Sequence, residues 1–400
     1  MQFVVKKRSI DEIVQVVFLL FITIMSVLVT FYSNKLNMLF YYSLLAIWFY
    51  YFLREHCRVR KSELVIIAYG ILTVFSTFFN GFFIADQQFV QVLWRPIRIF
   101  LSILIGYHFY FCTTTLTRKK FYWILYLLIL ISIAYGFYQK TAGIGWGYNS
   151  RMDSFFGHPI TYGSILIFGV WLTVYLIKSF PVKLILLFYI TLGLISTGSR
   201  SAWLSLVATI IPRVVLGLKA GTLKKRQVFI ILICIVLSIA FVFTKQFQNI
   251  YTSIFSRFSG MMNTASATQR LGSYYYIISE LLAQNPVRIL FGCGENASTR
   301  IMMKTVITLS LFGTTDCQYL TILYNYGFIG LGMAIFFFGS IFKRACVLSS
   351  NGEAKFIVLS LLGVLCSAFF YDFYGWLSIS TLFMLFSGIY LGLRASGNVH

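Results

Sequence analysis

The chain has 400 residues, of which 59% are hydrophobic and only 11% charged, and its mean hydropathy is +0.82. Soluble domains carry about 25% charged residues, so these values exclude an ordinary cytosolic enzyme, a disordered chain and a secreted disulfide scaffold. The net charge of +22 does not require a nucleic-acid partner, because Lys and Arg collect in the cytoplasmic loops of membrane proteins. The composition predicts a polytopic membrane protein.

A helix crosses the hydrocarbon core with roughly 20 apolar residues, and about twelve such runs follow one another along the chain. They cover residues 13–33, 38–53, 64–84, 91–112, 121–139, 160–177, 183–198, 201–217, 227–245, 317–339, 355–371 and 374–393. This pattern predicts an all-α fold with a single transmembrane domain, residues 1–400. Lys6, Lys7 and Arg8 precede the first run as in a signal sequence, but no small-residue cleavage site follows, so we expect a retained anchor.

The basic residues indicate how the spans are oriented. With the N-terminus in the cytoplasm, most of the 33 basic residues fall in short inner segments, as the positive-inside rule requires, and both termini are cytoplasmic. The outer basic residues are mostly arginines, whose guanidinium group binds phosphate or carboxylate in a bidentate way that an ammonium cannot. Chance in a small sample is the alternative. The outer arginines are Arg95, Arg98, Arg151, Arg200, Arg257, Arg270, Arg288 and Arg300.

Residues 246–316 form a long segment between the ninth and tenth predicted spans, and we expect a large extracytoplasmic loop there. Long loops are usually functional when they occur. Apolar residues from Leu271 to Leu282 follow helical spacing, with Thr268 as a plausible N-cap. This predicts an amphipathic helix over the mouth of the bundle, ended by Asn285-Pro286. Cys293 and Cys317 fall in the same region, and the sequence does not decide whether they form a disulfide.

The chain lacks the sequence motifs of several common types of functional site. It has no phosphate-binding glycine loop, no paired CxxC and no HExxH, and its histidines are widely scattered. An ATP-driven pump and a zinc site are therefore not expected, and we expect no cofactor, no metal and no nucleic acid. The chain also shows no inverted repeat of the transporter kind.

Two polar stretches lie at outer ends of predicted spans. In Arg151–Gly163, the glycines and Pro159 shape a turn that can present Arg151, Asp153 and His158. An interfacial loop in which Arg151 pairs with Asp153 is the alternative.

In the second stretch, Ser196–Trp203, Arg200 stands between two short apolar runs. A charge at that depth is costly and is a functional candidate by default, although snorkelling to the headgroups also explains it. The residues around Arg200 could leave backbone N–H groups free for an anion at the start of the eighth helix.

Two further stretches belong to the long loop and its end. Arg270 begins the loop helix, where a lone arginine is often merely solvated, and Gly292 and Gly294 permit a tight turn. Thr315 and Gln318 fit a capping box, which places Asp316 in the first turn of the tenth span. The helix dipole favours acids there for structural reasons and lowers the pKa of Asp316, which makes it a weaker base.

The order of these motifs carries a family resemblance. They are Arg151 with Gly157-His-Pro, then Thr197-Gly-Ser-Arg-Ser-Ala, then Arg270 with Asn285-Pro and Gly292-Cys-Gly, then Asp316-Cys-Gln-Tyr-Leu with Tyr326-Gly-Phe-Ile-Gly. Over roughly residues 145–335 the chain resembles the bacterial O-antigen and capsular polysaccharide polymerase (Wzy-type) family and is similar to the related O-antigen ligases. Ligases of this superfamily generally have His-Asn where this chain has Asp316-Cys317, and polymerases often have Asp-Asn. The missing histidine favours a polymerase, while Cys317 departs from both patterns.

The resemblance implies a metal-independent glycosyltransferase at the outer face of the bacterial cytoplasmic membrane, with an undecaprenyl pyrophosphate-linked oligosaccharide as donor. Arginines equivalent to Arg200 and Arg270 engage the pyrophosphate in that superfamily, and we expect Arg288 to assist. A chain-length regulator and a flippase of the same pathway are the expected protein partners, and membrane lipid surrounds the chain. An O-antigen ligase is one alternative. A lipid-oligosaccharide flippase or transporter is the other, but it should carry charge deep within several spans, whereas ionisable residues here crowd the outer half and the loops.

The base that takes the proton of the attacking sugar hydroxyl has several candidates. Asp316 is the first choice and His158 the second, because both lie near the outer mouth. We also expect Arg151, Asp153 and Tyr319 to contact substrate. The acids that remain open for the role of base are Asp153, Glu280, Glu295 and Asp372.

Overall fold

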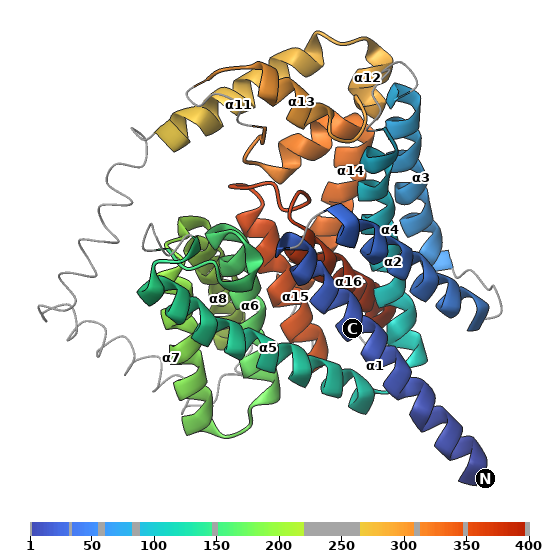
Figure 1. Ribbon diagram of the computed structural model, residues 1–400, viewed down its shortest axis with the longest axis vertical. Coiled ribbons are helices and arrows are strands. Elements are labelled where there is room, and N and C mark those ends of the chain that lie inside the picture. The colour runs from blue at the N-terminus through green and yellow to red at the C-terminus, as the bar shows by residue number, and fades with distance from the viewer. Residues whose placement is uncertain are drawn as a thin grey trace, which may run out of the picture.

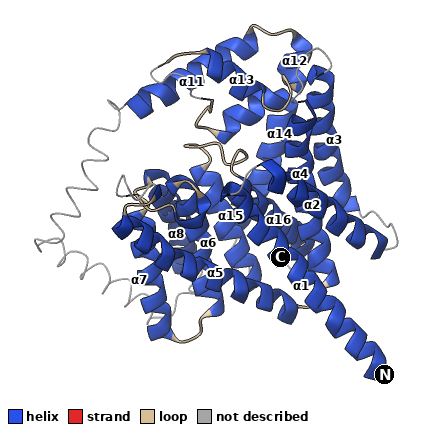
Figure 2. Cartoon of the chain, viewed as in Figure 1, coloured by secondary structure: helices blue, strands red, loops and turns tan. Residues whose placement is uncertain are grey.

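The structure is a computed structural model that describes residues 2–31, 34–54, 61–81, 89–145, 151–219, 265–307, 313–346 and 351–396. Within these ranges the regular structure is helical and includes no strand (Figure 2). The short η2 (Ser154–Phe156) is a 3-10 helix between two long α-helices.

The long helices coincide with the predicted spans. They are α1 (Gln2–Phe31), α2 (Asn34–Arg54), α3 (Lys61–Gly81), α4 (Phe89–Cys112), α5 (Thr115–Ala142), α6 (Pro159–Leu176), α7 (Phe180–Ser196), α8 (Arg200–Lys219), α14 (Gln318–Cys346), α15 (Gly352–Ser367) and α16 (Leu377–Ala395). The predicted run 227–245 lies outside the described residues. Among the described residues, 7 helices are long and apolar enough to cross a membrane, and Ile66–Asn80 and Phe180–Ser196 are shorter apolar helices. The prediction of an all-α polytopic membrane protein is confirmed.

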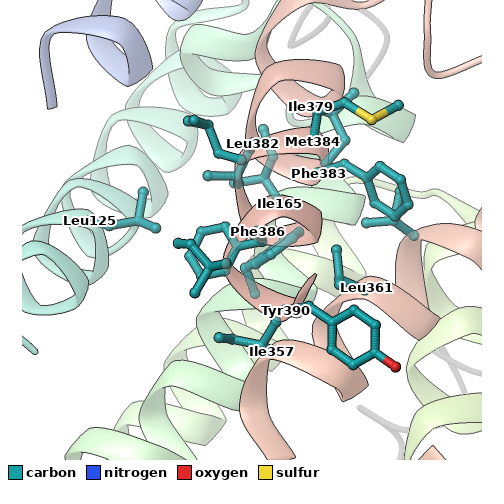
Figure 3. Packing of buried hydrophobic residues seen from close by; sticks show 14 of the residues in the cluster. Leu125, Ile165, Ile357, Leu361, Ile379, Leu382, Phe383, Met384, Phe386 and Tyr390 are labelled. Carbon is teal, nitrogen blue, oxygen red and sulfur yellow. The ribbon is translucent and has the colours of Figure 1, made fainter. Parts of the chain in front are cut away.

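The centre of the bundle is a close packing of α16 against α4, α6 and α15. Figure 3 shows Phe386 and Tyr390 of α16 among side chains of α5, α6 and α15. Small residues allow the backbones of α4 and α16 to touch, because a Cβ on Gly388 would lie 2.0 Å from the carbonyl oxygen of Ile103. This packed centre fixes the outer ends of α4, α14 and α16 relative to one another.

Three helices of the long loop lie across one end of the bundle, opposite the N-terminal end of α1 (Figure 1). They are α11 (Ala265–Leu282), α12 (Pro286–Phe291) and α13 (Ala297–Lys304), which we call the cap. Ile277 and Leu281 on the buried face of α11 pack against α14. The predicted amphipathic helix is confirmed, but it begins at Ala265, so Thr268 lies inside the helix rather than capping it.

Two contacts between segments distant in the sequence identify the two ends of the bundle. At the cap end, the hydroxyl of Ser76 in α3 donates to the carbonyl oxygen of Phe291 at 2.7 Å. At the other end, the α4–α5 connection meets the start of α15, where Nε of Arg118 lies 2.7 Å from Oε1 of Glu353. The contact between α3 and the cap and the Arg118–Glu353 pair therefore mark two different ends of the bundle.

Candidate functional site

Arg270 and Asp316, which are adjacent to each other only in the folded chain, form an ion pair beneath the cap. Nε of Arg270 lies 3.3 Å from Oδ2 of Asp316, and the two side chains are 24% and 15% exposed. The hydroxyl of Tyr274 in α11 donates to the carbonyl oxygen of Phe369 at 2.9 Å and holds this helix on the bundle. Within the described part of the chain, the ion pair engages one of the five N–H donors of the guanidinium group.

Asp316 does not lie in the first turn of the tenth span, so that prediction was wrong. The helix α14 begins at Gln318, and Asp316 stands in the connector before it with a left-handed backbone, φ 50°, which Asp tolerates better than most residues. The side chain of Gln318 accepts the N–H of Tyr374 at 2.8 Å instead of closing a capping box. Burial raises the pKa of Asp316 and Arg270 opposes this shift, so the carboxylate is a stronger base than a helix dipole would leave it.

A second group of polar side chains lies at the same end, and we call it the α4–α14 cluster: Arg95, Glu295, Thr321, Tyr326 and Asp372. Nη1 of Arg95 is 3.1 Å from Oε1 of Glu295, whose other carboxylate oxygen accepts a hydrogen bond from Tyr326. Glu295 is 2% exposed, whereas the side chain of Arg95 is 31% exposed. The cluster is therefore enclosed by helices but still reached by solvent.

Asp372 is held in this cluster by neutral donors. Its Oδ2 lies 3.1 Å from the hydroxyl of Thr321, and its Oδ1 accepts the N–H of Tyr374 at 3.2 Å. Burial raises the pKa of Asp372 to about 6, with Arg95 lowering it and Glu295 raising it. A carboxyl group with such a pKa can act as a general base near neutral pH.

Glycines bring Glu295 to its place in the cluster. Gly292 and Gly294 have φ of 86° and 88°, which confirms the predicted tight turn after α12. The N–H of Gly294 donates to the carbonyl oxygen of Asn325 at 2.9 Å, beside the point where α14 loses helical geometry at Gly327. A Cβ on Gly292 would lie 2.2 Å from that same carbonyl oxygen. The two glycine motifs noticed in the sequence are thus the two sides of one close backbone contact.

The outer loops that carry Arg151 and Arg200 contact each other. Nε of Arg151 donates to the carbonyl oxygen of Thr197 at 3.1 Å, so a backbone group holds this guanidinium. Arg200 is the first residue of α8 and is partly exposed. The hydroxyl of Ser199 accepts the N–H of Ala202 at 3.4 Å. The start of α8 is therefore partly capped by its own sequence and is less open to an anion than we predicted.

His158 caps the helix α6. Its Nδ1 accepts the N–H of Ile160 at 3.2 Å, and its ring centre lies 4.9 Å from that of Trp376. Burial, and to a smaller extent the charge of Arg151, lowers the pKa of His158 to about 4. The imidazole is neutral near pH 7 and its Nδ1 lone pair is engaged, which favours a structural role over that of a base.

The other predicted site residues have local partners. Nη1 of Arg288 donates to the side chain of Gln284 at 3.1 Å, and the hydroxyl of Tyr319 donates to the carbonyl oxygen of Leu365 at 2.9 Å. Asp153 is buried and precedes η2. These contacts stay within each segment and its neighbour, and they do not join the ion pair beneath the cap.

The loop 368–376 contacts both the start of α14 and the start of α6. Its first residue accepts the N–H of Gln318 at 2.9 Å, and Trp376 near its end packs on His158. Its one acid, Asp372, was only one of several open candidates in the sequence. A lone acid in an aromatic stretch at the outer end of a span was the signal that pointed to it.

Cys293 and Cys317 are both free thiols, so the disulfide that the sequence left open is not formed. Cys317 is buried with Ile277 and Leu281 in the apolar cluster beneath α11. At this position, where ligases and polymerases of the resembled superfamily have Asn, the chain therefore has a packing residue.

An apolar cavity of about 750 Å³ lies between α3, α14 and α16. Tyr69 and Tyr374 line one part of it, and Tyr374 also donates to Asp372 in the α4–α14 cluster. Phe337 and Met384 are among the apolar side chains of its wall. A predominantly apolar lining with few polar groups is typical of sites for apolar ligands.

Residues 185–337 match the O-antigen ligase family. This match confirms the resemblance inferred from the sequence, and it includes Arg200, Arg270 and Asp316 but not Asp372. Over this stretch the chain is similar to membrane proteins that process glycans, and its apolar helices agree with that similarity. No curated protein matches the chain.

Proposed function

We propose that the protein is a polysaccharide polymerase that transfers an undecaprenyl pyrophosphate-linked glycan onto the sugar of another lipid-linked repeat unit. It lies in the bacterial cytoplasmic membrane, with both termini in the cytoplasm and the cap on the outer face. The observation that carries the proposal is the Arg270–Asp316 ion pair inside the segment that matches the O-antigen ligase family. Ligases of the resembled superfamily generally have His at this position, so a carboxylate paired with arginine favours the polymerase.

The chemistry of the transfer suits an arginine-rich outer mouth. The acceptor hydroxyl attacks the anomeric carbon of the donor, and the lipid pyrophosphate leaves with the bonding electron pair. Negative charge grows on the leaving group, and Arg200 and Arg270, assisted by Arg288, stabilise it in this proposal. A positioned donor of this kind typically contributes about 10²–10³ in rate. The pyrophosphate linkage already stores the energy of transfer, so the reaction needs no nucleotide.

The surroundings of the site suit a lipid-linked substrate. The donor tail is apolar and the bilayer solvates it, while the cavity between α3, α14 and α16 offers a protein wall of the same character. A flippase that delivers the repeat unit and a regulator of chain length are the partners expected in such a pathway.

Purified protein in lipid nanodiscs tests the proposal when the lipid pyrophosphate-linked repeat unit is both donor and acceptor. We expect a ladder of products longer than one repeat. Arg200→Lys keeps the charge but loses the bidentate fork, so it should slow ladder formation, whereas Arg300→Lys on α13 is a matched control without effect. Wild-type protein that extends no chain would refute the polymerase, and a normal ladder with Arg200→Lys would refute bidentate binding.

An O-antigen ligase is the second candidate, because the matched family is described as O-antigen ligase. A ligase would move a finished chain to a different acceptor and leave single repeat units unjoined. Adding a lipid-anchored core oligosaccharide to the same reaction separates the two activities, because only a ligase labels that acceptor with preformed long chains.

A further inference from the structure

We infer that Asp372 takes the proton of the acceptor hydroxyl, and that Asp316 is a positioning residue for Arg270. The inference rests on the proposed glycan transfer. It concerns the proton of the attacking sugar, so it holds whether the acceptor is a second repeat unit or another glycan.

Asp316 is committed to its arginine. Oδ2 of Asp316 lies 3.3 Å from Nε of Arg270, the edge of the guanidinium group. Among the described residues the ion pair occupies one of the five N–H donors of this guanidinium group, and the remaining donors suit the oxygens of a pyrophosphate. If Asp316 took up a proton, it would lose the charge that orients Arg270 at the moment when the leaving group needs that arginine. The two roles conflict, and the geometry favours positioning.

Asp372 differs from Asp316 in the groups that hold its carboxylate. The partners that hold its carboxylate are the hydroxyl of Thr321 at 3.1 Å and the N–H of Tyr374 at 3.2 Å. Both are neutral, so they fix the orientation of the carboxylate without cancelling its charge. The residue is partly exposed, and a small polar group can therefore reach it.

The charges around Asp372 favour proton uptake. Arg95 from α4 is the cation that faces it, and this arginine is itself paired with Glu295 at 3.1 Å. Burial and the nearby carboxylate of Glu295 raise the pKa of Asp372 to about 6, while Arg95 opposes them. The titratable and charged groups that act on or face Asp372 from every packed element are Arg95, Glu295, Cys317, Tyr371 and Tyr374.

A short chain of hydroxyl groups runs from Asp372 toward the segment that carries Asp316. Oγ1 of Thr321 lies 3.1 Å from Asp372 and 2.8 Å from Oγ1 of Thr315, the residue before Asp316. Arg270 and Asp372 therefore lie at the same end of α14, with the start of this helix between them. A donor whose pyrophosphate binds Arg270 can present its anomeric carbon toward an acceptor hydroxyl on the side of Asp372.

The proposed step is balanced without a further reactant. The oxygen of the acceptor hydroxyl forms a bond to the anomeric carbon, and the bond from that carbon to the pyrophosphate oxygen breaks. The electron pair of the broken bond leaves with the lipid pyrophosphate. The hydroxyl proton passes to the carboxylate of Asp372 and then to solvent, which restores the base.

Rates of glycan transfer by the purified protein as a function of pH test the inference. Wild-type protein should lose kcat/KM as the pH falls through about 6, because Asp372 of the free protein becomes protonated. Asp372→Asn should lower kcat by about 10²–10⁴ and abolish this acid limb. Asp372→Glu should retain a limb at a shifted pH. Asp316→Asn should instead raise the KM for the donor and keep the limb, as expected for a residue that acts through Arg270.

Asp11→Asn, near the end of α1 that lies opposite the cap, is the matched control, and it should leave both the rate and the pH profile unchanged. Size-exclusion profiles of all variants establish that they fold. A limb that persists in Asp372→Asn, or one that disappears only in Asp316→Asn, would overturn the inference. If wild-type protein transfers glycan to another acceptor but builds no ladder, the polymerase fails, while the pH profile of that transfer still decides the role of Asp372.

Discussion

Two arginine–carboxylate pairs lie at opposite ends of the molecule, and their construction differs. Arg118 contacts Glu353 through two nitrogens, at 2.7 and 3.1 Å, and the side chains are 6% and 4% exposed. Arg270 contacts Asp316 through one nitrogen at 3.3 Å, with exposures of 24% and 15%. The first pair is closed, whereas the second leaves guanidinium donors facing outward from the pair.

The closed pair is saturated by its surroundings. Nη1 of Arg118 also donates to the carbonyl oxygen of Thr113 at 2.8 Å, and the hydroxyl of Tyr122 donates to Glu353 at 2.8 Å. The guanidinium carbon lies 4.4 Å from the ring centre of Tyr110, a favourable cation–π distance. The comparison teaches that an arginine–carboxylate pair can stabilise the fold or leave donors for a ligand. Which of the two it does depends on how many N–H donors of the arginine the fold already uses.

Arg118→Ala should have the largest effect on stability. It leaves Glu353 buried without its cation, and breaking a buried pair typically costs about 3–5 kcal/mol. The measurement is thermal unfolding of the detergent-solubilised protein, with size exclusion as the method that detects unfolding. Lys119→Ala removes an exposed charge next to it and is the control. Equal stability of the two variants would contradict the distinction between closed and open pairs.

Arg270→Lys should affect activity more than stability. The lysine keeps the charge but loses the planar fork, so we expect a rate of transfer lower by about 10²–10³. Partly exposed pairs contribute roughly 0–1 kcal/mol to stability, so the unfolding temperature should stay close to that of the wild type. A variant that unfolds early but transfers at the normal rate would reverse the assignment of this pair.

Gly292→Ala should disturb the cap end by an intermediate amount. The backbone at this position, with φ 86° and ψ 177°, is one that essentially only glycine adopts, and it costs another residue about 1–3 kcal/mol. The new Cβ would also meet the carbonyl oxygen of Asn325 at 2.2 Å. Displacement of the turn should move Glu295 and shift the acid limb of the rate. Gly332→Ala, where a Cβ meets nothing within 4 Å, is the control. Unchanged unfolding and an unchanged pH profile would show that the turn does not place Glu295.

His158→Asn should have the smallest effect near pH 7, within about 1 kcal/mol, because Asn keeps a capping acceptor. The pKa of His158 is about 4 in the folded chain, below the unfolded value of about 6.5. The unfolded state therefore binds a proton first, and the wild type loses stability as the pH falls from about 6.5 toward 4. Unfolding temperatures across this range should fall less steeply in the variant. Parallel curves would remove His158 as the cause.

The helical framework followed from local sequence. Runs of apolar residues are the primary signal for a spanning helix, and the long helices lie on the predicted runs wherever the structure describes them. Helix starts were less predictable. The cap at Thr268 failed because α11 already begins at Ala265, and the capping box at Thr315 failed because the side chain of Gln318 accepts the N–H of Tyr374 instead. Gly292 and Gly294 were predicted correctly, since a turn of that shape needs residues without a Cβ.

The candidate site was predicted in part. Arg270 and Asp316 were singled out, and they lie together although 46 residues separate them. The sequence pattern did not single out Asp372 among the candidate acids, and it did not predict that Arg95 pairs with Glu295. These residues lie in different parts of the chain, so no local pattern joins them. Burial is what raises the pKa of Asp372 to about 6, and burial depends on packing that no short stretch of sequence specifies.

The amino-acid sequence by itself determined that this protein is a bundle of apolar helices with charged residues gathered in its connections, because hydropathy and charge act locally along the chain. The tertiary structure alone decided which arginine is enclosed with its carboxylate and which pairs with it through a single nitrogen at a partly exposed position. That choice depends on contacts across 46, 200 and 235 residues, at Arg270–Asp316, Arg95–Glu295 and Arg118–Glu353. Such contacts are fixed only when the helices pack.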